Sequence, residues 1–245
     1  MRRLLPEPGP TSVDELLADY RPFEHPHPTR PFVAANMITT LDGRASVRGR
    51  SKDLGSEVDS EFLLKLRHRF DAIMVGAGTI RAERYGRIVK DPAARARREQ
   101  IGLPADPLAV IISGRLDLPF DAPIFTCGSG RILVFTSSDA PLPETATSLS
   151  VERIDGEISI EPVLLRLRKN HGVRAVLCEG GPHLYGQLEA ADVVDDLFLT
   201  TSPELVGGEP SPRILEGSLA EPRRKQLEEL LEHGGELFAR YRPRR

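Results

Sequence analysis

The stretch AIMVGAGT, residues 72–79, is an apolar run that leads directly into two glycines. A short, wholly apolar run is typical of a central strand in a parallel sheet, because such a strand is buried on both faces. The stretch AVLCEGGP, residues 175–182, has the same form. Each stretch therefore predicts a buried strand, a glycine turn and the start of a helix.

The segments around these two stretches alternate between strand and helix patterns. Further strands are predicted over residues 32–38, 108–112, 132–135, 193–200 and 236–241, the last at an edge. Helices are predicted over residues 12–17, 56–70, 159–170, 182–189 and 222–234. The arginine-rich segment 84–106 is expected to be mobile and solvated. This alternation predicts an α/β fold with a mostly parallel central sheet and helices on both faces.

Composition excludes several classes of protein. The 245 residues include 33 Lys and Arg against 36 Asp and Glu, so the basic excess typical of nucleic-acid binders is missing. Apolar stretches fall far short of the roughly 18 residues that span a bilayer, and the N-terminus lacks the apolar core of a secretory signal. Two cysteines suit a reducing cytoplasm. His25 and His27 lack further ligands at suitable spacing, so we expect no metal site.

The two glycine turns are candidate phosphate sites. Glycines allow a ligand to approach the backbone closely, and the N–H groups at a helix start attract anions. Pro182 suits the first turn of a helix because its missing N–H costs nothing there. In a parallel sheet both turns lie at the carboxyl edge, where open α/β folds bind ligands. We therefore predict a pyrophosphate-bearing ligand such as a dinucleotide; the alternative is that the glycines serve only the turn geometry.

Charged and polar residues at strand and helix ends are candidates for holding a substrate. Asp42 and Glu179 each follow a predicted strand, and both could hydrogen bond to an N–H-rich ring. The alternatives are a turn corner for Asp42 and a surface position for Glu179. Arg67 is either a phosphate ligand or part of a solvated helix face. Ser113 and Arg115 follow the strand 108–112 and could meet a ribose or its 2′-phosphate, or simply cap the following loop.

Four stretches occur in a characteristic order: NMITTLDGR (36–44), VGAGTIR (75–81), CEGGPHL (178–184) and SPELVGG (202–208). Over about residues 31–242 the sequence resembles the reductase domain of the bacterial riboflavin-biosynthesis deaminase/reductase, a relative of dihydrofolate reductase. The resemblance implies a dihydrofolate-reductase-like fold with an antiparallel C-terminal edge, a reductase domain over residues 31–245 preceded by an extension of residues 1–30, and a cytoplasmic homodimer. It also implies NADPH as hydride donor and 5-amino-6-(5-phosphoribosylamino)uracil as substrate, whose ribosyl group is reduced to ribityl.

The resemblance and the two glycine turns together assign a candidate role to each site residue. The cofactor-binding candidates are Ile38, Gly76, Gly78, Thr79, Glu83, Ser113, Gly180, Gly181, Pro182, His183 and Leu184. The substrate-binding candidates are Asn36, Thr40, Asp42, Ser51, Arg67 and Glu179, of which Asp42 and Glu179 are also the catalytic candidates. On this interpretation Asp42 and Glu179 hold the pyrimidine and the reacting sugar, and Arg67 holds the 5′-phosphate.

Three departures from the family pattern leave alternatives open. The sequence contains no His-x-Glu followed by Pro-Cys-x-x-Cys, so zinc-dependent deamination is not expected. Asn36 stands where the family often has lysine, and residues 81–87 replace an acidic stretch. One alternative is therefore an NADPH-dependent reductase of dihydrofolate or of another pterin or pyrimidine. Another is an NADP-binding protein that has lost catalysis.

Overall fold

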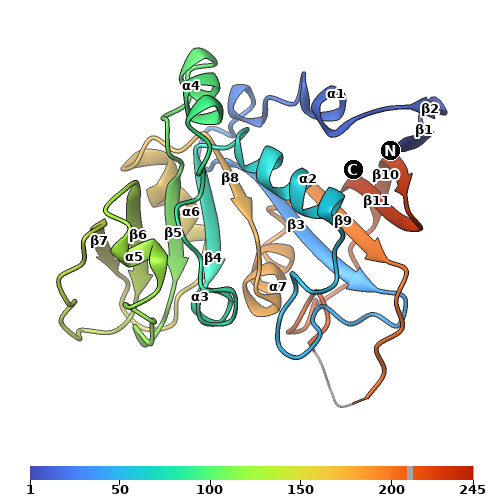
Figure 1. Ribbon diagram of the computed structural model, residues 1–245. Coiled ribbons are helices and arrows are strands. Elements are labelled where there is room, and N and C mark those ends of the chain that lie inside the picture. The colour runs from blue at the N-terminus through green and yellow to red at the C-terminus, as the bar shows by residue number, and fades with distance from the viewer. Residues whose placement is uncertain (209–211, 245) are drawn as a thin grey trace. The chain divides into compact units, whose positions relative to one another are not determined.

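A computed structural model describes residues 1–208 and 212–244 (Figure 1). The chain forms two compact units, and both are built from discontinuous stretches. Unit 1 contains Met1–Arg21, Val33–Leu66 and the chain from Cys178 onward, and unit 2 contains Pro22–Phe32 and Arg67–Leu177.

Unit 2 contains the parallel strands that the sequence predicts. The strands lie in the order β8 (Ala175–Cys178), β4 (Ala72–Gly76), β5 (Leu108–Ile112), β6 (Arg131–Thr136) and β7 (Ser148–Arg153). The pairs β4–β5, β5–β6 and β6–β7 are parallel. Residues 72–75 are buried, which confirms the interpretation of the apolar run. The last residue of β8, Cys178, is where the chain passes into unit 1. The sequence analysis missed β7, whose alternating exposed and half-buried residues give a weaker signal.

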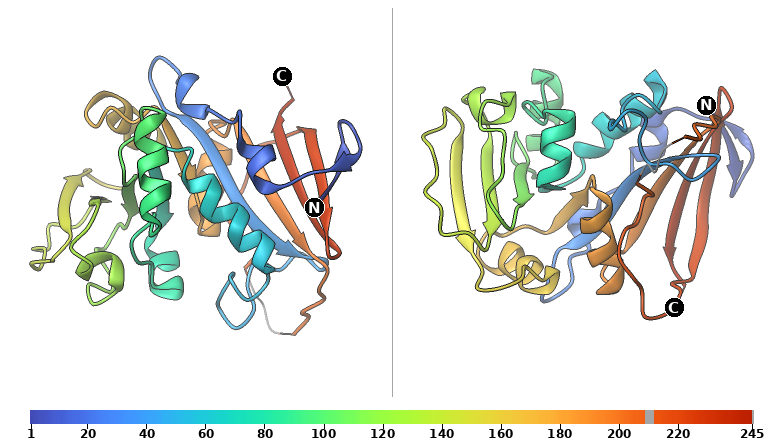
Figure 2. Two further views of the ribbon diagram at one scale, coloured as in Figure 1. Left: turned by 45° about the horizontal axis from the view of Figure 1, so that its top comes forward. Right: turned by 90° about the horizontal axis from the view of Figure 1, so that it is seen from below.

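Helices cover the strands of unit 2 on both faces. They are α3 (Ala77–Glu83), α4 (Pro92–Gln100), α5 (Pro123–Thr126) and α6 (Ile160–Lys169), with a short 3₁₀ helix, η1, over Pro22–Glu24. Figure 2 shows α4 and α6 on opposite sides of these strands. The helix α4 corrects the expectation that segment 84–106 is mobile. Asp91 caps this helix by accepting hydrogen bonds from the Ala93 and Ala94 amides, and Pro92 opens its first turn.

Unit 1 contains one parallel pair and a set of antiparallel strands. The strand order is β3 (Phe32–Thr40), β9 (Asp196–Ser202), β11 (Glu236–Pro243), β10 (Lys225–His233), β1 (Arg2–Leu5) and β2 (Gly9–Pro10). β3 and β9 are parallel, and the remaining pairs are antiparallel. The antiparallel C-terminal part of the predicted fold is thereby confirmed. β11 itself is not an edge strand, because it pairs with β9 on one side and with β10 on the other.

The predicted helix over residues 222–234 is wrong, because most of this segment forms β10. Lys, Gln, Leu and Glu favour helices in isolation, but pairing on both sides with β11 and β1 overrides this preference. Leu231 of β10 is buried opposite Phe238 of β11. Gly234 and Gly235 both have positive φ, 59° and 89°, and they form the two-residue turn of the hairpin.

The helices of unit 1 begin at residues that the sequence identifies. They are α1 (Val13–Leu17), α2 (Glu57–Arg67, whose last residue belongs to unit 2) and α7 (Pro182–Ala190). The capping box of α1 is confirmed: Ser12 Oγ accepts from the Glu15 amide at 3.2 Å, and the Glu15 carboxylate accepts from the Ser12 amide at 2.9 Å. α2 ends three residues earlier than predicted. Its Phe62 ring lies 5.6 Å from that of Phe198 on β9 and helps form the core of unit 1.

The N-terminal residues are integrated into unit 1. β1 pairs with β10. Tyr20 follows α1 in the chain, and its hydroxyl donates to the fully buried Asp196 carboxylate at 2.8 Å. Arg240 and Arg242 donate hydrogen bonds to the same carboxylate. A buried carboxylate is tolerated when such donors surround it, so Asp196 fixes this segment to β9 and β11.

Candidate active site

In unit 2 the glycine turn after β4 forms the start of α3. Gly76 is the N-cap residue and no side chain caps this helix. A Cβ added to Gly78 would have Arg81 Nη2 at 3.9 Å as its nearest neighbour, so the surface above this turn is open. Thr79 lies in the same turn, and Glu83 is the last residue of the helix. The first-turn N–H groups therefore lack a capping side chain, as an anion site requires.

Ser113 lies at the same edge of unit 2 as this turn. β4 and β5 are parallel and Gly76 pairs with Ile112, so the strand ends that lead into Ala77 and Ser113 are adjacent. Ser113 is buried, and its amide donates to the Phe135 carbonyl at 3.0 Å. Ser113 thus directly follows β5, as the sequence predicts.

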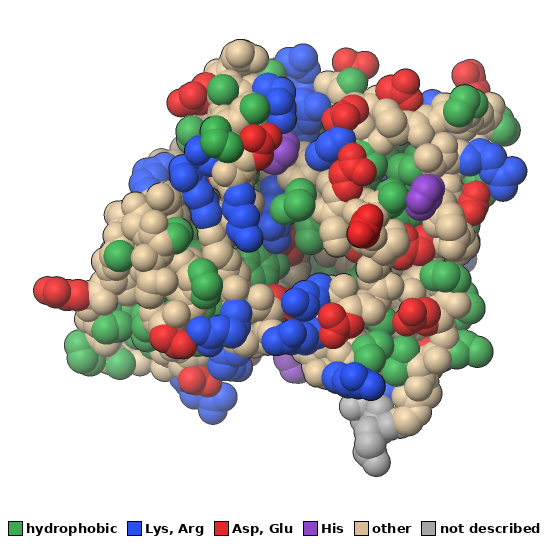
Figure 3. Space-filling model, viewed as in Figure 1, with side chains coloured by type: hydrophobic (Ala, Val, Ile, Leu, Met, Phe, Trp, Pro, Cys, Tyr) green, Lys and Arg blue, Asp and Glu red, His purple; other side chains and the backbone are tan. Residues whose placement is uncertain are grey.

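Basic side chains gather over the part of unit 2 that contains α3 and α4 (Figure 3). Two of them are paired with acidic residues in the loop after β5. Arg81 Nη1 lies 3.1 Å from Asp117 Oδ2, and Arg84 Nη2 lies 2.7 Å from Asp121 Oδ2. Arg115 is exposed, and no ion pair joins it to a residue of the described chain. Arg67 is half-buried, with its guanidinium carbon 5.3 Å from the centre of the Tyr85 ring.

In unit 1 the Asp42 carboxylate is surrounded by donors. Thr40 Oγ1 donates to it at 2.5 Å, the Gly207 amide at 2.8 Å and the Val206 amide at 3.3 Å. These hydrogen bonds, with that of Thr40 the largest contribution, lower the pKa of Asp42 to about 2. Asp42 is therefore ionised at neutral pH and accepts hydrogen bonds without supplying a proton. The sequence analysis assigned no role to Val206 and Gly207, which are 164 and 165 residues away in the chain.

Asn36 and Ile38 lie on one face of β3, because residues two apart in a strand share a face. Their partners on β9 are Phe198 and Thr200. The Asn36 Oδ1 atom is buried, and it has no hydrogen-bond partner among residues 1–208 and 212–244. A buried acceptor without a donor is costly, so this atom is suited to a donor on a ligand. Ser51 lies beyond β3 and is half-buried, and its carbonyl accepts from the Leu54 amide at 3.0 Å.

The second glycine turn forms the start of α7 in unit 1. The Gly180–Gly181 peptide bond is cis, Gly181 is the N-cap residue, and no side chain caps this helix. Pro182 occupies the first turn, as predicted. The side chain of Leu184 is buried. The exposed His183 lies 2.7 Å from Glu216 through Nε2 and Oε2.

Glu179 connects Cys178 to this turn and is half-buried. Cys178 is fully buried, and burial raises the pKa of its thiol to about 12. A thiol of such high pKa is protonated at neutral pH and is a poor nucleophile. Of these two residues, only Glu179 is partly exposed.

The candidate residues are divided between the two units. Unit 1 contains Asn36, Ile38, Thr40, Asp42, Ser51 and the run from Glu179 to Leu184. Unit 2 contains Arg67, Gly76, Gly78, Thr79, Glu83 and Ser113. In the part of the chain that the structure describes, we find no helix long and apolar enough to cross a membrane. Nor do the described residues contain a group of three or more His, Cys, Asp or Glu side chains that could hold a metal ion.

Known proteins are similar to this chain in sequence and in fold. The chain is 32% identical over 216 residues to the 2,5-diamino-6-ribosylamino-4(3H)-pyrimidinone 5′-phosphate reductase of Archaeoglobus fulgidus, covering 86% of this chain and 96% of that protein. It is 27% identical over 192 residues to the riboflavin biosynthesis protein RibD of Bacillus amyloliquefaciens, of which it covers 49%.

Solved structures agree with these sequence matches. A pyrimidine reductase-like protein from Corynebacterium diphtheriae superposes with a TM-score of 0.80 at 25% identity, covering 96% of this chain and 100% of that one. The riboflavin biosynthesis reductase Rib7 of Saccharomyces cerevisiae, at 20% identity and a TM-score of 0.65, shares the fold. The family model described as the RibD C-terminal domain matches residues 31–236. The chain therefore belongs to the RibD C-terminal domain family.

Proposed function

We propose that this protein is an NADPH-dependent reductase that converts the ribosyl group of a phosphoribosylaminopyrimidine to ribityl. The observation that carries this proposal is the match to the Archaeoglobus fulgidus reductase over nearly the full length of both chains. That coverage includes all of the candidate cofactor and substrate residues. The proposal makes the protein an enzyme of the riboflavin-pathway type.

The residues present suit NADPH. The starts of α3 and α7 have glycine N-caps without a capping side chain, and their N–H groups can donate hydrogen bonds to phosphate oxygens. When bound, NADPH supplies the hydride. The residues that we propose to contact it are Ile38, Gly76, Gly78, Thr79, Glu83, Ser113, Gly180, Gly181, Pro182, His183 and Leu184. Their role is to bind and orient the cofactor and to keep water away from it.

Arg115 is the best candidate for the 2′-phosphate that distinguishes NADPH from NADH. Arg81 and Arg84 already pair with Asp117 and Asp121, and a second anion would have to compete with those carboxylates. Arg115 follows Ser113 closely and is exposed. An Arg115→Ala variant is expected to lose affinity for NADPH and to keep its affinity for NADH.

On the substrate side, the proposed contacts are acceptors for the ring and a cation for the phosphate. Asp42 and Glu179 accept hydrogen bonds from N–H groups of the pyrimidine and from hydroxyls of the opened sugar. A carboxylate has about four acceptor positions, so Asp42 can bind substrate while it holds Val206 and Gly207. Asn36, Thr40 and Ser51 add polar contacts, and Arg67 binds the 5′-phosphate.

Two substrates of this class deserve comparison. The resemblance found in the sequence implies 5-amino-6-(5-phosphoribosylamino)uracil, whereas the Archaeoglobus relative is named for the 2,5-diamino-pyrimidinone. The two rings differ in whether an amino group or an oxygen stands at position 2. The orphan Asn36 Oδ1 is an acceptor and favours a ligand that offers a donor. Rates of NADPH oxidation with each compound decide between them.

The experiment that tests the proposal measures NADPH consumption with both pyrimidines and with dihydrofolate. We expect turnover with at least one phosphoribosylaminopyrimidine and little with dihydrofolate. Turnover with dihydrofolate alone would support the pterin alternative, and NADPH binding without any turnover would support an inactive binding protein. The homodimer and the cytoplasmic location stay predictions, which sizing of the purified protein and localisation of a tagged chain would check.

A further inference from the structure

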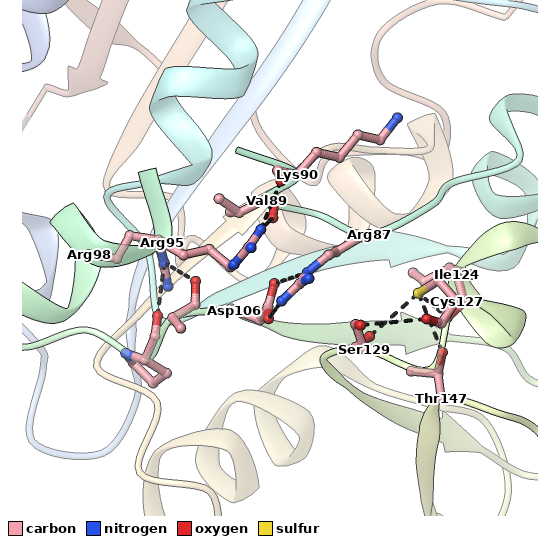
Figure 4. A network of polar contacts seen from close by, with 12 residues as sticks. Arg87, Val89, Lys90, Arg95, Arg98, Asp106, Ile124, Cys127, Ser129 and Thr147 are labelled. Atoms are coloured by element: carbon pink, nitrogen blue, oxygen red, sulfur yellow. Dashed lines mark hydrogen bonds and ion pairs between the residues drawn. The ribbon is translucent and has the colours of Figure 1, made fainter. Parts of the chain in front are cut away.

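Arg98 is a fully buried arginine on α4 of unit 2. Among residues 1–208 and 212–244, its guanidinium donates only to backbone carbonyls. Nε donates to the Pro104 carbonyl at 2.9 Å and to that of Ala105 at 3.2 Å. Nη1 donates to the Arg67 carbonyl at 2.9 Å, and Nη2 donates to the Phe70 carbonyl at 2.9 Å. Figure 4 shows this side chain beside Asp106, which follows the first two acceptors in the chain.

Asp106, the residue that follows the acceptors Pro104 and Ala105, is held by an ion pair of its own. Asp106 receives a two-point ion pair from Arg87, with Nε at 2.9 Å and Nη2 at 2.5 Å from the two carboxylate oxygens (Figure 4). Such paired contacts fix orientation as well as distance. Burial lowers the pKa of Arg98 to about 10, so the side chain stays charged at neutral pH. A buried charge is stable only when its donors are satisfied, and four backbone carbonyls accept from this one.

Two of these acceptors lie where α2 ends. Arg67 is the last residue of that helix, and Phe70 lies three residues further along the chain. The final carbonyls of a helix lack partners within the helix, and a basic side chain can satisfy them. Arg98 therefore holds the backbone of Arg67 from a different helix. The sequence analysis could not find this contact, because it assigned residues 84–106 to a solvated segment.

The side chain of Arg67 is held as well. Its guanidinium carbon lies 5.3 Å from the centre of the Tyr85 ring, a distance at which an aromatic face attracts a cation. The Tyr85 carbonyl in turn accepts from the Ile124 amide at 2.7 Å, which fixes Tyr85 to α5. Arg67 is thus restrained at its backbone by Arg98 and at its guanidinium by Tyr85.

We propose that Arg98 and Tyr85 are positioning residues that hold the Arg67 guanidinium in place for the 5′-phosphate of the substrate. The inference rests on the proposed function, in which Arg67 binds that phosphate. A free arginine side chain loses considerable rotamer entropy on binding an anion. Restraining the side chain beforehand removes part of that cost, so the restraint is expected to lower KM for the phosphorylated substrate.

The test compares the phosphorylated substrate with the same compound after removal of its 5′-phosphate. The variants are Arg98→Lys, Tyr85→Leu, Tyr85→Phe and Arg67→Met, with Arg97→Lys as the matched control. Arg97 lies next to Arg98 on α4, but it is exposed and pairs with Asp91. KM, kcat and the dissociation constant of NADPH are measured for each variant, with circular dichroism as the check on folding.

Arg98→Lys and Tyr85→Leu are each expected to raise KM for the phosphorylated substrate about tenfold, with kcat and NADPH affinity within about twofold of wild type. With the dephosphorylated substrate both variants are expected to match wild type. Tyr85→Phe, which keeps the aromatic ring, is expected to have the KM of wild type. Adding Arg98→Lys to Arg67→Met is expected to have no further effect, because the two act through one contact.

Equal losses with both substrates, or additive losses in the double variant, would overturn the inference and leave Arg98 a purely structural residue. If Arg98→Lys does not fold, Tyr85→Leu carries the test, and an unchanged KM there would overturn it. Failure of the proposed function has a different signature: the wild-type protein turns over neither pyrimidine. That result would remove the inference together with the function on which it rests.

Discussion

The Asp42 carboxylate accepts a hydrogen bond from the Gly207 amide at 2.8 Å, which ties the turn after β3 to the loop after β9. A second backbone contact supports the same junction, since the Leu41 amide donates to the Glu204 carbonyl at 2.9 Å. β3 and β9 are parallel neighbours and Thr40 pairs with Ser202, so both loops leave the same edge of unit 1. The first and the last of the four sequence motifs therefore meet at one carboxylate.

Substitution of Asp42 should affect the enzyme in a pH-dependent way. The lowered pKa of about 2 means that Asp42 stabilises the fold above its unfolded pKa of about 4, and that this contribution is lost as pH falls toward 2. Asp42→Asn is therefore expected to be less stable than wild type at pH 7, with the difference shrinking between pH 4 and 2. Urea unfolding at a series of pH values measures this. A difference that stays constant down to pH 2 would contradict the assignment.

Substitution of Asp59 is expected to change stability in the opposite direction. It lies on α2 near Glu236, whose carboxylate bonds to the amide and hydroxyl of Ser56. Burial, with a smaller contribution from the Glu236 charge, raises the pKa of Asp59 to about 6. A raised carboxyl pKa destabilises the fold as pH rises from the unfolded value through the folded one. Asp59→Asn is expected to be more stable than wild type at pH 8, by up to about 3 kcal/mol.

The advantage of Asp59→Asn should disappear below pH 4, where the wild-type carboxyl is protonated in both states. Thermal or urea unfolding of both proteins at pH 4 and pH 8 provides the measurement. Equal stability at pH 8 would show that Asp59 ionises without cost.

Glu179 is expected to act on the substrate and not on the cofactor. Glu179→Gln keeps the size of the side chain and removes its charge, so kcat/KM should fall about 100-fold or more if the carboxylate holds the reacting sugar. The dissociation constant of NADPH, measured by fluorescence, should stay within about twofold of wild type. An equal loss in NADPH affinity would instead place Glu179 on the cofactor side.

Gly186 is required by a close approach within unit 1. A Cβ at this position of α7 would lie 2.0 Å from the Glu216 carbonyl oxygen. Alanine in place of glycine stabilises an exposed helix by about 1 kcal/mol, but a clash with backbone costs more. Gly186→Ala is therefore expected to destabilise the protein by about 1–3 kcal/mol. The exposed neighbour Gln187→Ala serves as control and should change stability by less than about 0.5 kcal/mol; a stabilised Gly186→Ala would disprove the contact.

Local signals in the sequence predicted the elements that depend on nearby residues. The apolar runs ending at Val75 and Cys178 became buried strands, and Ser12 with Glu15 formed the expected cap. β10 was misassigned because its side chains favour a helix, while the strand is imposed by partners elsewhere in the chain. The pair Gly234 and Gly235 was the available signal for a hairpin, since two glycines between runs of residues suit such a turn.

The candidate site shows the same division. The glycine turns at Gly76 and Gly181 could be predicted, because a strand, a glycine and a helix start are adjacent in sequence. The partners of Asp42 could not, since Gly207 is brought to it only by the pairing of β3 with β9. The burial of Arg98 could not be predicted for the same reason. Nothing in the local sequence distinguishes Arg98 from the exposed Arg97, and only the packing of α4 buries it.

The most direct test of the proposed function is the rate of NADPH oxidation by the purified protein with the 2,5-diamino-pyrimidinone and uracil forms of the phosphoribosyl substrate. We expect substrate-dependent oxidation, with the ribitylamino compound as product by mass spectrometry. Loss of this rate in Glu179→Gln would confirm that it comes from this site. Binding of NADPH with no ribitylamino product from either compound, at high enzyme concentration, would contradict the proposed function.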